Sequence, residues 1–231
     1  MRFRIDLKIF LLIILFFLTK QIELYAMMMF FAIIHELGHL FTGITLGMRP
    51  EKLELNPFGL SVSFKILPKE YNMKLKKANS FELKKIFIAM AGPVTNLLVI
   101  LTVTFMSIDT YPKQLIIYSN LLLVMFNILP IYPLDGGRVV KGLLHIFVGK
   151  YKSDKYINNI SFITLSILTA ISSIAILYIN NIAIFLGIIT LWVIYIREEK
   201  VYRNREKIYE MIRNRYNDNY LQKYNETIEN K

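Results

Sequence analysis

The sequence contains no cysteine, three histidines and one tryptophan among its 231 residues. The lack of cysteine excludes disulfide bonds, thiolate metal sites and a cysteine nucleophile, so any metal must be held by histidine and carboxylate side chains. Charged residues are also scarce, at 19%, whereas hydrophobic residues make up 55% and the mean hydropathy is +0.43. This balance argues against a soluble globular protein of this size and predicts a polytopic membrane protein.

Long apolar stretches mark the expected membrane segments, because a helix that crosses a hydrocarbon core of about 30 Å needs roughly 17 to 25 residues. The six stretches are Ile9 to Leu18, Leu24 to Met48, Ile86 to Ile108, Leu115 to Ile131, Ile160 to Ile179 and Ile182 to Ile196. The first is short and spans only if Lys8 and Lys20 reach the two interfaces. A signal peptide is the alternative, but no small-residue cleavage site follows it. We therefore expect an all-α polytopic membrane protein with about six transmembrane helices.

The basic residues give this chain a net charge of +11, and their positions indicate an orientation. With the N-terminus in the cytosol, 26 of the 28 lysines and arginines fall on the cytosolic side, and only Lys20 and Lys113 face the other side. This asymmetry is typical of multi-pass proteins of the cell membrane. We expect both termini to be cytosolic. The lipid bilayer explains the basic charge, so no nucleic-acid partner is required.

Two regions outside the apolar stretches have patterns of their own. Residues on both sides of Asn56-Pro57-Phe58-Gly59 alternate between apolar and polar, which predicts a short juxtamembrane β-hairpin with an unpaired edge between Leu53 and Phe64. Residues 197–231 mix both charge signs with spaced apolar positions, which predicts a helical cytosolic tail. The expected domains are therefore a transmembrane domain, residues 1–196, and a charged tail, residues 197–231.

Two of the three histidines lie four residues apart inside the second apolar stretch, in the sequence His35-Glu36-Leu37-Gly38-His39. This spacing places both imidazoles on one helix face, where they can bind a single ion. The pattern predicts a zinc site in which Glu36 accepts a proton from water. The alternative is a chance pair of polar side chains in a helix bundle, but ionisable groups inside a span are costly and usually functional.

A catalytic zinc site normally has three protein ligands, so a further residue is needed. The fourth apolar stretch ends in Pro130, Pro133 and the sequence Asp135-Gly136-Gly137, where the prolines and glycines should break the helix and present a carboxylate at its cytosolic end. Asp135 is the predicted third ligand, and a turn-forming aspartate is the alternative. His145 competes for this role from beyond the break. The second and fourth segments both run toward the cytosol, so His39 and Asp135 can meet.

Two asparagines are candidates for binding a substrate. Asn96 follows Gly92 and Pro93, which we expect to allow close helix packing, and its amide can donate to a substrate carbonyl or an oxyanion. Asn127 precedes the helix break and is either a helix-end hydrogen bonder or a substrate clamp. The sequence alone does not separate these roles.

These motifs together resemble the site-2 protease family of intramembrane zinc metalloproteases. The resemblance depends on the motifs at 35–39 and 127–137, supported by Pro57-Phe58-Gly59 and Ala91-Gly92-Pro93. It implies zinc (Zn2+) held by His35, His39 and Asp135, and Glu36 as the catalytic carboxylate. It also implies a membrane-anchored protein substrate cleaved in or near its transmembrane segment, and regulatory membrane proteins as further partners. Phe58 in the hairpin turn joins the two asparagines as a predicted substrate-binding residue.

Within this family the chain resembles the sporulation branch, which cleaves a membrane-associated pro-sigma factor. That branch typically has Pro-Phe-Gly-Gly where this chain has Leu60 after Gly59, and it carries a nucleotide-binding cystathionine-synthase-type domain that residues 197–231 are too short to form. Two other functions use the same residues: a membrane metal transporter, and a non-catalytic relative that binds membrane proteins. The single strong helix break argues against the transporter. Glu36 argues against the non-catalytic relative.

Overall fold

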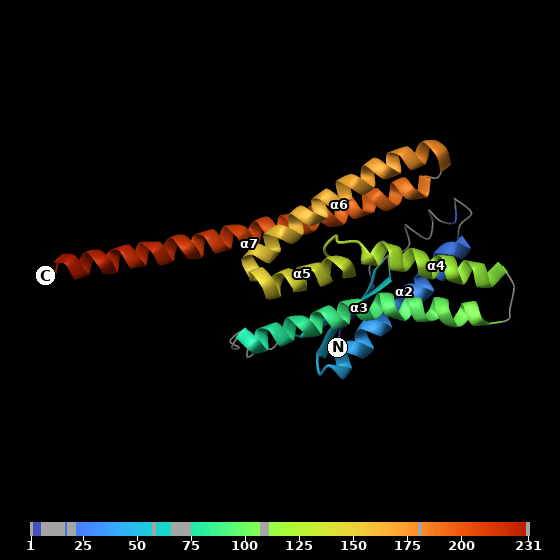
Figure 1. Cartoon of the computed structure of the whole chain (residues 1–231), viewed down its shortest axis with the longest axis horizontal. Helices are drawn as coiled ribbons and strands as arrows, with labels where there is room; N and C mark the ends of the chain where they lie inside the picture. Colours follow the sequence, from blue (N-terminus) through green and yellow to red (C-terminus); the bar gives the residue numbers. More distant parts are fainter. Residues whose placement is uncertain are drawn as a thin grey trace. The chain divides into compact units, whose positions relative to one another are not determined.

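The computed structural model describes residues 2–5, 17, 22–56, 59–65, 75–106, 111–179 and 182–229, which form six helices and three strands (Figure 1). In chain order these elements are β1 (Arg2–Ile5), α2 (Ile22–Thr45), β2 (Arg49–Asn56), β3 (Gly59–Lys65), α3 (Leu75–Phe105), α4 (Tyr111–Ile128), α5 (Asp135–Val148), α6 (Lys150–Ile179) and α7 (Ile182–Glu229). The expected fold class, a helical membrane protein with a small sheet, is confirmed.

Five of the six predicted membrane segments coincide with helices α2, α3, α4, α6 and α7. The first predicted segment, Ile9 to Leu18, lies outside the described residues apart from Phe17. Among the described residues, three segments are long and apolar enough to cross a membrane: Tyr25–Thr45, Asn79–Phe105 and Lys150–Ile174. The chain is therefore a multi-pass membrane protein. Helix α5 was not predicted, because Lys141, Gly142 and His145 interrupt its apolar positions.

The hairpin predicted on both sides of residues 57–58 is confirmed, since β2 and β3 pair antiparallel. The predicted unpaired edge at Leu53 is wrong, because β1 pairs with β2 in parallel and places Phe3 opposite Leu53. Residues 2–5 alternate Arg, Phe, Arg and Ile, a period-two pattern too short to identify as a strand by itself. In the described part of the sheet, only β3 of the two hairpin strands keeps a free edge.

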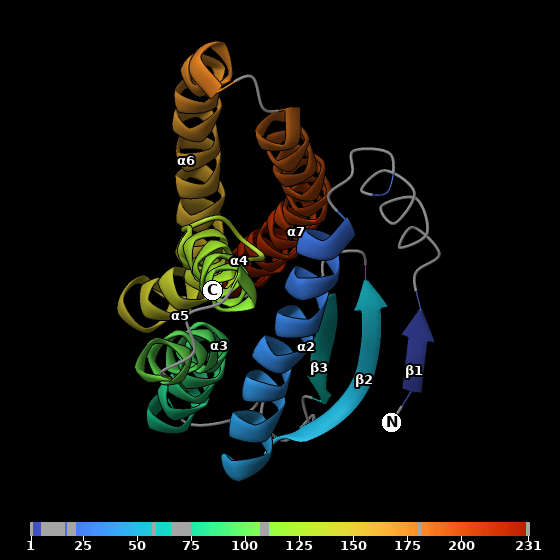
Figure 2. The ribbon, with the colours of Figure 1, turned by 90° about the vertical axis from the view of Figure 1, so that its right-hand side faces the viewer.

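The sheet lies against α2, and β3 is its nearest strand (Figure 2). Gly43 of α2 allows this contact, because a Cβ atom there would overlap the ring of Phe64 from β3. On another side of α2, a small apolar cluster joins three helices. Its members are Phe31 and Ala32 of α2 and Leu123 of α4, with Val99 of α3 and Ile116 of α4 packed against them. Helix α2 is thus held between the sheet and the α3–α4 pair.

Clustering of contacts divides the chain into two compact units, Met1–Thr164 and Leu165–Lys231, and helix α6 runs through the division. Within the second unit, Leu165 of α6 and Leu191 of α7 are buried, and the indole of Trp192 on α7 donates to the Thr169 hydroxyl on α6 (3.0 Å). Helix α7 continues without interruption past residue 196 into the charged tail. The predicted domain boundary at 196 stays a prediction.

Helix α5 packs on α3 through Gly142, and we expect that contact to tolerate no added methyl group. A Cβ atom at Gly142 would lie 2.6 Å from Cγ1 of buried Ile86. We predict that Gly142→Ala lowers the free energy of unfolding by about 1–3 kcal/mol through overpacking, and that Ile86→Ala in the same chain recovers part of the loss. Denaturation in detergent measures both. Leu143→Ala, on an exposed position of α5, is the control, and equal destabilisation by the control would contradict this packing.

Candidate metal centre

Helix α2 brings the two predicted histidine ligands together. His35 and His39 lie one turn apart on its buried face, with ring centroids 4.7 Å apart and ring planes nearly perpendicular. The helix forms readily there because the 24 residues of α2 are mostly apolar and include no proline. The predicted sharing of one helix face is confirmed.

Asp135 reaches the histidines because the chain stops being helical just before it. Helix α4 ends at Ile128, residues 129–134 are irregular, and Asp135 is the first residue of α5. The predicted break is thus confirmed for the segment that contains Pro130 and Pro133.

The expectation that Gly136 and Gly137 also break the helix is wrong. Both lie in the first turn of α5. Their role is close approach: a Cβ atom would lie 2.6 Å from the carbonyl oxygen of Leu129 at Gly136, and 2.5 Å from that of Ile131 at Gly137. Glycine at both positions lets the irregular segment fold back on α5, which places Asp135 against α2.

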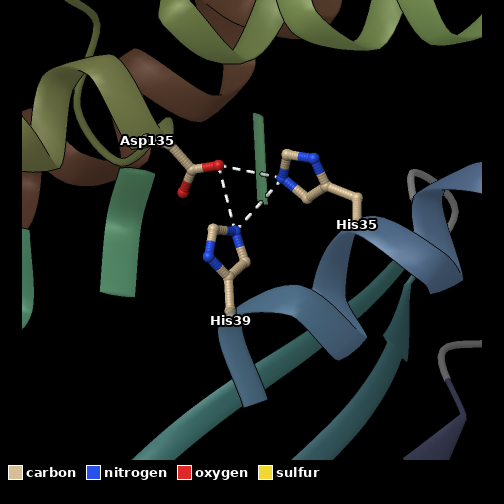
Figure 3. A group of neighbouring side chains, drawn as sticks. All are labelled: His35, His39 and Asp135. Atoms are coloured by element: carbon tan, nitrogen blue, oxygen red, sulfur yellow. Dashed lines mark hydrogen bonds and ion pairs between the residues drawn. The ribbon is translucent and has the colours of Figure 1, made fainter. Parts of the chain in front are cut away.

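The three side chains converge on one point (Figure 3). Oδ2 of Asp135 lies 2.9 Å from Nε2 of His35 and 3.1 Å from Nε2 of His39, and the two Nε2 atoms are 3.1 Å apart. Three atoms with lone pairs face one another at nearly equal distances. Ligands about 2.0–2.1 Å from a tetrahedral zinc ion are about 3.3 Å apart, so a slight expansion of this triangle accommodates the ion. Among the described residues, this is the group whose atoms are arranged to hold a metal.

The surroundings of the group also suit a metal. All three residues are buried, with 4% or less of each exposed. Nδ1 of His39 lies 2.6 Å from the carbonyl oxygen of Ile88, so Nδ1 carries the hydrogen and Nε2 keeps its lone pair for an ion. The outer oxygen of Asp135, Oδ1, lies 3.5 Å from the Arg138 guanidinium, which leaves Oδ2 to face the histidines.

Gly92 of α3 completes the wall of the site, a role that the sequence did not reveal. A Cβ atom at this position would lie 2.5 Å from both Nε2 of His35 and Cε1 of His39. The predicted close packing at Gly92 is therefore present, and its neighbours are the ligands themselves. The available signal was the combination of Gly92 and Pro93 inside an apolar stretch, because both residues weaken a helix and are retained where backbones approach closely.

Of the other predicted site residues, Glu36 and Asn127 are described by the structure and Phe58 is not. Glu36 is half-buried on α2, next to His35 and close enough to His39 to interact with it electrostatically. Asn127 is half-buried, and its amide donates to the Leu123 carbonyl (3.0 Å) in its own helix. Phe58 lies outside the described residues.

Asn96 lies one turn after Gly92 on α3 and has no exposed surface. His145 is not part of the metal group, because its Nδ1 pairs with the Glu82 carboxylate at 3.2 Å. The substrate roles of Asn96, Asn127 and Phe58 stay predictions.

Comparisons with known proteins agree with this geometry. The model of peptidase family M50 matches residues 110–171, the stretch that contains Asp135. The chain is 30% identical over 138 residues to the zinc metalloprotease MJ0392 of Methanocaldococcus jannaschii, a match that covers 55% of this chain and 36% of that protein. It is 26% identical over 127 residues to the stage IV sporulation protein FB of Bacillus subtilis, covering 53% of this chain and 41% of that protein.

A solved structure, the site-2 protease from Methanocaldococcus jannaschii, has the same fold, with a TM-score of 0.62 and 22% identity over 84% of this chain and 88% of that one. The chain therefore shares the fold of this site-2 protease, and part of it is similar to peptidase family M50. It matches well under half of the length of each of the two curated relatives named above. Zinc is the metal of the named metalloprotease relative, and the His35, His39 and Asp135 group fits it.

We predict that Asp135→Asn weakens zinc binding, because it replaces an anionic ligand with a neutral amide that binds zinc poorly. The metal content of the purified protein should fall well below one zinc per chain after mild chelation that leaves the unchanged protein loaded. Ser172→Ala is the control, because Ser172 is a buried polar residue of α6 whose hydroxyl donates to the Thr169 carbonyl of its own helix. Full zinc occupancy in Asp135→Asn and Asp135→Ala would assign the third ligand to another residue.

Proposed function

We propose that this chain is an intramembrane zinc metalloendopeptidase that hydrolyses a peptide bond in or near the transmembrane segment of a membrane-anchored protein. One observation carries the proposal: a three-ligand metal group lies beside a carboxylate, Glu36, within an apolar helix that can span a membrane. A polar group of this kind is costly in hydrocarbon, and metal-assisted hydrolysis gives a reason for that cost.

The chemistry follows from the positions of the side chains. His35, His39 and Asp135 would hold a zinc ion, which would supply a Lewis acid to acidify water and polarise a carbonyl. Glu36 takes one proton from the attacking water, whose oxygen forms a bond to the scissile carbonyl carbon. When the C–N bond breaks, Glu36 returns that proton to the leaving nitrogen. No proton or electron is gained or lost in the cycle, so the chain needs no redox partner.

The substrate must be extended at the cut, because the amide of a helical peptide is shielded and its carbonyl already accepts a hydrogen bond. We propose that the edge of β3 left free in the described part of the sheet holds the substrate as an added strand, and that Phe58 contacts the substrate. The Asn127 amide would leave the Leu123 carbonyl to donate to the oxyanion. Substrates with Gly, Pro or Asn near the cut should be favoured, because unwinding costs less there.

The orientation of the site decides where the product is released. The distribution of lysine and arginine supports a cytosolic location for both termini and for the opening of the site. Cleavage near the cytosolic end of the substrate helix would leave a remnant too short to anchor a domain, which would then enter the cytosol. A membrane-associated pro-sigma factor, the substrate implied by resemblance to the sporulation branch, is the first substrate to test, together with regulatory membrane proteins as partners.

We predict that Glu36→Gln abolishes proteolysis but keeps zinc, because glutamine preserves the size of the side chain and removes the base. The cleavage rate in co-expression with a candidate substrate should fall by at least about 10²- to 10⁴-fold. Glu23→Gln, in the first turn of the same helix, is the control and should cleave normally. Near-normal cleavage by a zinc-loaded Glu36→Gln protein would refute this mechanism.

The cytosolic orientation can be tested by cysteine labelling, because the chain has no cysteine of its own. We predict that an impermeant maleimide applied outside intact cells labels Tyr111→Cys, at the exposed start of α4, but leaves Lys152→Cys, at the exposed start of α6, unlabelled. Permeabilised cells, in which both variants should react, provide the control. The reverse pattern would invert the topology and eliminate release to the cytosol.

A further inference from the structure

Four buried polar atoms around the metal group have no hydrogen-bond partner in the described part of the chain. They are Nδ1 of His35, both polar atoms of the Asn96 side chain, and Oδ1 of Asn120. An imidazole that binds a metal through Nε2 carries hydrogen on Nδ1, so Nδ1 of His35 and Nδ2 of Asn96 are donors. The oxygens of Asn96 and Asn120 are acceptors. The set therefore contains two donors and two acceptors.

The packing of α2 against α3 brings His35 and Asn96 to the same region. The two helices are antiparallel. Lys84, early in α3, donates to the Leu46 carbonyl just after α2, His39 contacts Ile88 and Gly92, and His35, earlier in α2, contacts Gly92. Asn96 lies one turn beyond Gly92 on the same face. Side chains of a helix lean toward its N-terminus, so those of His35 and Asn96 lean toward each other. In Figure 3, the second ring nitrogen of His35 points away from the other two ligands.

The hairpin of α3 and α4 places Asn120 at the level of Asn96. Near the turn of this hairpin, the Lys113 ammonium donates to the Thr104 carbonyl at 3.3 Å. Asn96 lies eight residues before Thr104 on α3, and Asn120 lies seven residues after Lys113 on α4. The two asparagines are therefore about equally far along their helices from the turn of the hairpin.

The face of α4 that carries Asn120 also points toward α3. Ile116 and Leu123, one turn before and one turn after Asn120, both belong to the cluster that includes Val99 of α3. The Asn120 amide nitrogen donates to the Ile116 carbonyl (2.8 Å), which anchors the side chain and leaves only Oδ1 to be satisfied.

We propose that Asn96 is a positioning residue for the metal centre. With zinc bound, its Oδ1 would accept the Nδ1 hydrogen of His35, and its Nδ2 would donate to Oδ1 of Asn120. The structure does not contain these two hydrogen bonds, so the side chains must turn toward each other to form them. This relay gives His35 the support that the Ile88 carbonyl gives His39, and it satisfies all four atoms at once. In a membrane bundle such groups have no bulk water to bond with, so internal pairing is strongly favoured. The proposal deepens the proposed function by naming what orients one of its ligands.

A direct role of Asn96 in substrate binding is the competing assignment. Asn96 and Asn120 are both 0% exposed, so neither offers a surface that a substrate peptide can contact. The two assignments predict different measurements. A positioning residue changes the affinity for zinc, whereas a substrate clamp changes KM in a protein with normal zinc binding.

The first test is the zinc affinity of the full chain, measured by competition with a chelator. Asn96→Leu, which has nearly the same volume but no acceptor, should weaken zinc binding by about 10- to 100-fold. Asn96→Asp keeps the acceptor and should bind zinc at least as tightly as the unchanged protein. Asn120→Leu should weaken binding less, because it acts one bond further away. Ser119→Ala is the control, since this buried hydroxyl bonds only to Leu115 of its own helix among the contacts described.

The second test uses Co²⁺ in place of zinc and observes the exchangeable Nδ1 hydrogens of the bound histidines by NMR. The unchanged protein should show two slowly exchanging signals, one for His35 and one for His39. Asn96→Leu should broaden the His35 signal by solvent exchange and leave the His39 signal in place. A general loss of structure would affect both, so this readout separates positioning from folding.

The proposal is overturned if Asn96→Leu keeps normal zinc affinity and both cobalt-shifted signals, whether or not KM rises. If Asn96→Leu fails to insert into the membrane, Asn96→Asp and Asn120→Leu decide the question. The proposal is overturned if Asn96→Asp binds zinc more weakly than the unchanged protein. It is also overturned if Asn120→Leu shows both a normal His35 signal and normal zinc affinity. None of these measurements requires cleavage of a peptide. Failure of the relay therefore leaves the peptidase proposal intact, and failure of Glu36-dependent cleavage leaves the relay intact.

Discussion

The close approach of α3 to α2 at Gly92 is the contact on which the metal centre depends. With no side chain at this position, the backbone of α3 lies directly against the imidazoles of His35 and His39. The same approach lets the Ile88 carbonyl accept the Nδ1 hydrogen of His39, so one helix both encloses the site and orients a ligand. Any side chain at Gly92 would occupy the space of the imidazoles. Gly38 of α2 allows the same close approach of the two helices, because a Cβ atom there would overlap the Thr95 side chain of α3.

The third ligand depends on a different device, a short irregular segment between two helices. Residues 129–134 turn the chain so that α5 starts with Asp135 already beside α2. The backbone amide of Tyr132 donates to the Ser161 hydroxyl (3.0 Å), and Lys141 lies over the Tyr132 ring while pairing with Asp154. These contacts tie the segment to α5 and α6. A carboxylate held from several sides can meet two histidines with little loss of side-chain entropy.

The location of the polar groups explains how a polar metal group is accommodated in an apolar bundle. The exposed residues of α3 and α6 include many large hydrophobic side chains, such as Phe87, Leu98 and Ile163, as expected for helices that face lipid. His35, His39 and Asp135 are buried and pair with one another, and the buried Ser119 hydroxyl donates to the Leu115 carbonyl of its own helix. These buried polar groups therefore satisfy one another or their own backbone.

The sequence by itself determined the membrane class and the hairpin, and it singled out the group of His35, His39 and Asp135. Apolar length, period-two alternation and the spacing of histidine and aspartate residues are local properties, which is why the sequence carries them. Only the tertiary structure decided the pairing of β1 with β2, the presence of α5, and the position of Gly92 against the imidazoles. Each of these depends on which distant segments pack together: residues 2–5 are too few to predict a strand, and a glycine in an apolar stretch gives no sign of what it faces. These features come from long-range packing, which local sequence patterns do not encode, so only the tertiary structure revealed them.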